Sequence, residues 1–206
     1  MVKFVTAIFG VLIIVTSAHA ADNKLGKQAQ DFIGSLSNQV TTLNQDRSLD
    51  HNTRRQKFIQ LVETGFDLPW IAKFVVGRPW RTATTIQQKE YLELFKNLVE
   101  LTYSKRFIEY AQQKILVSGY KLGKRKFIFV ESKLTDPKKP KGDINVVWRL
   151  VPKGNSFKIV DVVIAGISMA ITQRNEYSAV IRRNNGRFDA LLDAMRTQIT
   201  KLRNNS

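Results

Sequence analysis

The sequence predicts an α+β domain in which a four-stranded antiparallel sheet is embraced by helices on its N-terminal and C-terminal sides. Apolar residues recur at three- and four-residue steps before residue 113, which is the period of amphipathic helices. The period changes to two over residues 114–165, and helical spacing returns after Ser168. Because the connections between the strand-like runs are short, we expect antiparallel pairing.

The sequence pattern predicts three helices before the longest one. Residues 24–45 carry one apolar stripe, and residues 54–63 form a second, shorter pattern. Asp67 is placed to begin a third helix, with Pro69 tolerated in its first turn and Gly77 at its end.

The longest predicted helix covers residues 85–113. Thr84 and Gln87 stand three residues apart, the spacing of a capping box at a helix N-terminus. A helix of this length would extend about 43 Å at 1.5 Å per residue. We therefore expect it to bend or break.

Four strand-like runs follow, at residues 114–120, 126–134, 144–151 and 157–165. Residues 136–142 form a basic loop, and Pro152 to Asn155 are typical of a hairpin turn. Gly166 ends the last strand, and Ser168 is placed to cap a helix over residues 168–184, which is followed by a final helix over 187–202.

The first twenty residues have the pattern of a secretory signal. Lys3 gives a positive start, residues 4–16 are apolar, and Ala18-His19-Ala20 is a small-x-small cleavage pattern. We expect cleavage after Ala20, export of the chain, and a mature chain of one domain over residues 21–206.

The charge of the chain favours a polyanionic partner. The 206 residues carry 33 Lys and Arg against 17 acids, a formal net charge of +16. Export makes nucleic acid the least plausible of such partners. An exported polyanion-binding module without an internal ligand, centred on the basic stretch from Lys121 to Lys141, is retained as the alternative function.

Few residues in the chain suit catalysis or metal binding. Cysteine is absent, and His51 is the one histidine outside the predicted signal, so neither a catalytic triad nor a zinc site can be assembled. Asp161 lies in a strand, where we expect it to pair with Arg149 or Arg174 and hold the following turn. The sequence therefore predicts no enzyme, no cofactor and no metal, and an acid–base role for Asp161 is the weaker alternative.

Several ordered blocks resemble one family. Phe66 to Ala72 with Val76 to Arg81 is similar to its opening block, and Gln87 to Tyr103 is similar to its long helix. Its closing block is matched by Val147 to Leu150, Lys158 to Val162, Gly166 to Met169 and Arg174 to Tyr177. The sequence thus resembles the MlaC-like periplasmic phospholipid-binding proteins, also called the toluene-tolerance or auxiliary transport component family, and the similar hopanoid-associated HpnM group.

The resemblance implies a lipid carrier that helps to maintain the lipid asymmetry of the outer membrane. The cargo would be a glycerophospholipid, or a hopanoid, held by its apolar part in a pocket between sheet and helices. The partners would be an outer-membrane lipoprotein complex and an inner-membrane ABC transporter complex with an MCE-domain protein. Each buried CH₂ is worth ~0.8 kcal/mol, so one ~16-carbon tail in water costs on the order of 12 kcal/mol, which requires an enclosed pocket.

The candidate lipid-binding residues come from both layers. The strand residues share one face, and Ile167 belongs to the Gly-Ile-Ser turn: Ile144, Val146, Trp148 and Ile167. The helix residues are Phe74, Phe95, Val99 and Tyr103. The partner strand is ambiguous. A four-residue hairpin loop would pair Trp148 with Ile159, and one more loop residue would bring Val160 and Val162 onto that face.

Overall fold

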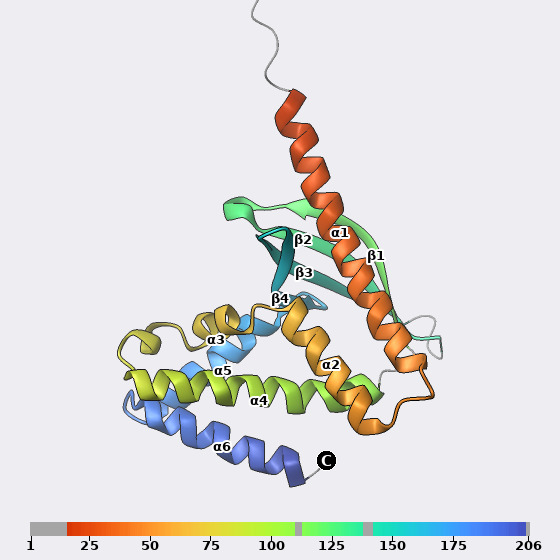
Figure 1. Ribbon diagram of the computed structural model, residues 1–206. Coiled ribbons are helices and arrows are strands. Elements are labelled where there is room, and N and C mark those ends of the chain that lie inside the picture. The colour runs from red at the N-terminus through yellow and green to blue at the C-terminus, as the bar shows by residue number, and fades with distance from the viewer. Residues whose placement is uncertain (1–15, 110–112, 138–141, 205–206) are drawn as a thin grey trace, which may run out of the picture.

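A computed structural model of the chain describes residues 16–109, 113–137 and 142–204. A five-stranded sheet forms one layer, a long first helix lies across it, and the remaining five helices gather in a second layer beside one end of the sheet (Figure 1). The predicted α+β class is confirmed.

The elements follow in the predicted order. The helices are α1 Thr16–Gln45, α2 His51–Gly65, α3 Leu68–Val76, α4 Thr85–Glu109, α5 Met169–Arg183 and α6 Phe188–Asn204, with short 3₁₀ turns η1 Arg78–Arg81 and η2 Lys124–Lys126. The strands are β1 Lys114–Leu122, β2 Ile128–Thr135, β3 Ile144–Lys153, β4 Ser156–Ile164 and β5 Ile167–Ser168.

The sheet contains five strands, so the predicted number of four is wrong. Its order is β1-β2-β3-β4-β5, and every neighbouring pair is antiparallel. The additional strand is the Ile167-Ser168 pair, which folds back on β4 after a tight turn at Ala165 and Gly166, both with positive φ. A two-residue strand is too short to give an alternating pattern in the sequence.

Both hairpin registers weighed from the sequence are wrong. β3 and β4 are joined by a two-residue loop, since Lys153 pairs with Ser156, and Gly154 has the positive φ that favours such loops. A bulge between Arg149 and Leu150 then shifts the pairing, so that Trp148 lies opposite Val162.

The start of β2 differs from the prediction as well. Lys124 to Lys126 form η2, and both Arg125 and Lys126 have positive φ, so the strand begins at Ile128 and not at residue 126. The predicted basic loop lies partly outside the described residues, because residues 138–141 do.

One face of the sheet packs against α1, and we call it the α1 face. Ala29 and Ile33 of α1 are buried with Ile128 and Val130 of β2 and Leu150 of β3. α1 approaches β1 closely: a Cβ added at Gly26 would lie 2.0 Å from the Tyr120 ring. Only glycine fits at this crossing without moving the helix or the ring.

The second layer has a separate core built around Tyr91 of α4. Its ring meets Phe95, Tyr177 and Phe188 at centroid distances of 5.8–6.2 Å, and its hydroxyl donates to the Ala72 carbonyl at 2.8 Å. Burial raises the pKa of the Tyr91 phenol far above its usual range. Helices α3, α4, α5 and α6 are thereby held together by one aromatic centre.

The predicted helix signals are confirmed. Thr84 and Gln87 exchange the two hydrogen bonds of a capping box at the start of α4. Asp67 caps α3 through the Trp70 N–H, with Pro69 in the first turn. α4 is one continuous helix over Thr85–Glu109, so the expected break does not occur there, and residues 110–112 lie outside the described residues.

Candidate functional site

The four candidate residues on the strands lie on the α1 face. Ile144, Val146 and Trp148 alternate along β3. Val146 lies between Ser132 of β2 and Ile164 of β4, and Ile164 in turn pairs with Ile167 of β5. The structure therefore brings the predicted strand residues together as one apolar surface crossing four strands.

The cover over this surface is incomplete. Under α1 the face is closed, with Leu150 and Ile159 fully buried. Towards the start of β3, Ile144 is 38% exposed, and Ile167 is 58% exposed. The apolar face thus continues past the helix that covers it, and this exposed corner has the character of the rim of an apolar binding site.

A buried polar pair fixes the orientation of Trp148. Its indole Nε1 donates to Ser132 Oγ at 2.9 Å, and Ser132 Oγ donates to the Val146 carbonyl at 3.2 Å. Both polar groups are satisfied inside an otherwise apolar face. The indole ring is therefore held on the α1 face, with its N–H directed towards Ser132 on the neighbouring strand.

The helix candidates Phe74, Phe95 and Val99 belong to the core of the second layer. Phe95 is buried beside Tyr91, and Val99 packs against the same core. Phe74 stacks on Trp70 at 5.5 Å and lies under the Arg174 guanidinium at 5.1 Å. The fourth, Tyr103, is exposed. The structure therefore divides the eight candidates between the α1 face and the helical layer.

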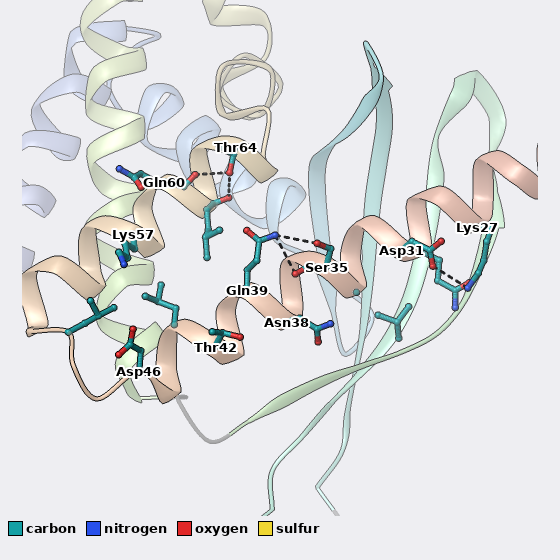
Figure 2. Close-up of a pocket in the computed structure, with 16 residues that line it drawn as sticks. Lys27, Asp31, Ser35, Asn38, Gln39, Thr42, Asp46, Lys57, Gln60 and Thr64 are labelled. Atoms are coloured by element: carbon teal, nitrogen blue, oxygen red, sulfur yellow. Dashed lines mark hydrogen bonds and ion pairs between the residues drawn. The ribbon is translucent and has the colours of Figure 1, made fainter.

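Two clefts flank α2. The larger, about 1040 Å³, lies between α1 and α2, and Figure 2 shows that polar side chains from both helices line it. Gln39 there donates to Ser35, and Thr64 donates to the Gln60 carbonyl. Polar residues outnumber apolar ones around this cleft, and the apolar side chains among them are Leu43, Leu49, Leu61 and Val117.

The smaller cleft, about 350 Å³, lies on the other side of α2. Its lining includes Phe66, Leu68, Leu92 and the candidate Phe95. Across it, Lys96 of α4 forms an ion pair with Glu63 of α2, and within α4 the same Lys96 lies 3.8 Å from the Glu100 carboxylate. Burial raises the pKa of the Glu100 carboxyl. Sequence reasoning missed both clefts because they lie between helices whose relative placement the sequence does not give.

Both carboxylate oxygens of Asp161 make contacts that hold the turn from β4 into α5. Its Oδ2 accepts from Ser168 Oγ at 2.6 Å and its Oδ1 from the Ala170 N–H at 3.0 Å, while Arg149 Nη1 lies 3.6 Å away. Arg149 also lies against the Phe127 and Phe129 rings. The predicted pairing with Arg149 is confirmed, and the carboxylate faces away from the α1 face.

Among the described residues, no group of three or more His, Asp or Glu side chains is arranged to hold a metal ion. A helix long and apolar enough to cross a membrane is likewise absent from residues 16–109, 113–137 and 142–204.

The chain is similar to a known protein family and to solved structures. The family model described as MlaC protein matches residues 34–197. The fold is similar to that of a phospholipid-binding protein from Ralstonia solanacearum, solved in complex with a phospholipid, with a TM-score of 0.71. The two chains share 22% sequence identity, and the match covers 85% of this chain and 98% of the other.

Proposed function

This chain belongs to the MlaC protein family, and from that membership we propose that it is a periplasmic lipid carrier. It holds the acyl chains of a glycerophospholipid and shuttles them between an outer-membrane lipoprotein complex and an inner-membrane ABC transporter complex with an MCE-domain protein. Residues 1–20 are the export signal, removed after Ala20. The phospholipid complex of the Ralstonia solanacearum protein of similar fold supports the cargo class.

The observation that carries the proposal is the apolar face of the sheet that continues beyond α1. Aliphatic side chains form a surface that crosses four strands and ends in half-exposed isoleucines. Exposing such a surface to water is unfavourable, so an apolar molecule that covers it is bound favourably. An acyl chain of ~16 carbons would gain on the order of 12 kcal/mol from such burial. Cargo and surface thus stabilise each other.

The proposed lipid contacts are the eight residues named from the sequence. Ile144, Val146, Trp148 and Ile167 supply the sheet side of the site. Phe74, Phe95, Val99 and Tyr103 supply the helix side. Asp161 has a structural role in this proposal, because its acceptor oxygens already serve Ser168 and Ala170.

Substitution at the exposed corner tests the site. Ile167→Glu adds a charge where the proposal places acyl chains, and desolvating that charge is expected to lower phospholipid occupancy about tenfold or more. Leu116→Glu is the matched control, because Leu116 is 54% exposed, also lies in a strand, and sits on the opposite face from the Ser132 row.

Occupancy is measured by native mass spectrometry of the mature protein purified without detergent. Equal occupancy in wild type and Ile167→Glu, with both folded by circular dichroism, would contradict the proposed site. Solvent extraction of the bound molecule identifies the cargo, and a hopanoid in place of a phospholipid would correct the cargo class while leaving the apolar site in place.

A further inference from the structure

Five arginines gather at one end of the helical layer, a surface that we call the arginine end: Arg78, Arg81, Arg182, Arg183 and Arg187. They come from η1, from the last turn of α5 and from the connection to α6. Figure 1 shows η1, the start of α4 and the α5–α6 connection at the same end of this layer, away from the sheet.

Hydrogen bonds and ring contacts hold these segments together. Gln87 of α4 donates to Asp189 at the start of α6, which brings the segment after η1 beside the α5–α6 connection. Trp80 of η1 packs against Tyr91, and Tyr91 packs against Phe188, the first residue of α6. These contacts bring the segments that carry the five arginines to one end of the helical layer.

The positive charge at this end is not neutralised within the protein. All five side chains are exposed, and none of them makes an ion pair or side-chain hydrogen bond with the described part of the chain. Of the nearby acids, Glu90 and Asp193 pair with Arg196, and Asp189 accepts a hydrogen bond from the neutral Gln87 amide. One uncompensated carboxylate thus stands against five arginines. The N-termini of α4 and α6 lie at the same end and add to its positive potential.

An exposed aliphatic side chain stands among these charges. Ile86, in the first turn of α4, is 80% exposed, with Lys89 one turn further along the helix. An isolated exposed isoleucine is ordinary on a protein surface. Beside five unpaired arginines it completes the combination of cations and an apolar group that binds the interface of an anionic bilayer.

We propose that the arginine end is a docking surface for an anionic phospholipid bilayer. Guanidinium groups bind phosphate in a bidentate manner, and a bilayer presents phosphates at a density that five arginines can engage together. Ile86 enters the boundary between headgroups and acyl chains. The inference goes beyond the proposed lipid carrier and does not rest on it, because a protein without internal cargo can dock through the same groups.

Vesicle sedimentation of the full mature chain tests the proposal. The protein is expected to bind vesicles of mixed phosphatidylglycerol and phosphatidylcholine, to remain unbound with phosphatidylcholine alone, and to dissociate as the salt concentration rises. The variant Arg81→Gln/Arg183→Gln/Arg187→Gln is expected to bind the mixed vesicles on the order of a hundredfold more weakly, at about fivefold per arginine.

The matched control removes three cations from the η2 turn, through Lys124→Gln/Arg125→Asn/Lys126→Asn. These cations are also exposed, and asparagine tolerates the positive φ of Arg125 and Lys126. We expect this control to bind within about threefold of wild type, since its net charge falls equally while the arginine end is intact. Ile86→Ser is expected to weaken binding severalfold, and Ile171→Ser, at another exposed isoleucine, to leave it unchanged.

Two results would overturn the proposal. Equal weakening of the arginine variant and the η2 control would show that net charge alone drives binding. Absence of wild-type binding to the mixed vesicles would show that the arginine end does not recognise a bilayer and would turn attention to an acidic protein partner. Phospholipid occupancy by native mass spectrometry, measured on the same samples, separates either failure from a failure of the carrier function.

Discussion

Asp161 offers a quantitative test of the turn that supports Ile167. The carboxylate is 3% exposed and accepts hydrogen bonds from Ser168 Oγ and the Ala170 N–H, with Arg149 Nη1 3.6 Å away. Asp161→Ala removes all three interactions at once. The α5 N-terminus then loses its anionic acceptor, and Arg149 loses its counter-ion.

The expected cost is large because Asp161 is buried and its partly buried partners would lose their acceptor. Removing one member of a buried ion pair costs about 3–5 kcal/mol, most of it the penalty of leaving the other groups unsatisfied. For a domain of this size we expect the melting temperature to fall by roughly 10 °C. Asp161→Asn keeps one carbonyl acceptor of the same shape and is expected to cost about half as much.

Urea unfolding followed by tryptophan fluorescence measures these costs. The midpoint is expected to fall while the slope stays constant, as for a change in native-state stability alone. Asp31→Ala is the control, because Asp31 makes an exposed pair with Lys27 at 3.2 Å that is worth about 0.5 kcal/mol or less. A loss below about 1 kcal/mol in Asp161→Ala would refute the structural role. Loss of lipid transfer in folded Asp161→Asn would instead support the weaker acid–base alternative.

Two further predictions concern pH and helix packing. For Asp67, burial opposes ionisation, but hydrogen bonds from Lys153 and the Trp70 N–H outweigh it and hold the pKa of the carboxyl below its ordinary value of 3.8. Its stabilisation is therefore present above pH 3.8 and lost as the pH falls through the lower folded-state pKa, so the unfolding free energies of wild type and Asp67→Asn converge in acid; a constant difference between them would contradict this assignment. In α1, Gly26→Ala meets the Tyr120 ring and is expected to lower stability, whereas Gly34→Ala has nothing within 4 Å and is expected to raise it by about 0.5–1 kcal/mol; equal effects in thermal melts would contradict the close crossing of α1 over β1.

Local signals in the sequence predicted the local structure well. The capping pair Thr84 and Gln87, the Asp67 cap and the Ser168 cap each depend on residues within four positions of one another, and each occurs as expected. The alternation along β3 placed Ile144, Val146 and Trp148 on one face for the same reason. Such features follow from residue spacing alone.

Features that depend on distant contacts were not predictable. The β3–β4 register is set by one bulge, in which Val160 is the extra residue. Valine is an ordinary strand residue, so the sequence does not indicate that a bulge occurs there. The division into a sheet core and a Tyr91 core depends on how α1 and α4 are placed, which periodicity does not specify. The family resemblance agreed with the fold, but it did not locate the cleft between α1 and α2.

Lipid retention is the most direct test of the lipid carrier. The mature protein, purified without detergent, is analysed by native mass spectrometry and by solvent extraction, and the stripped protein is then mixed with phospholipid vesicles. We predict that phospholipid co-purifies with the wild-type chain and that the stripped protein regains it from the vesicles. A protein that is folded, free of lipid as purified, and unable to take up lipid from vesicles would contradict the carrier function.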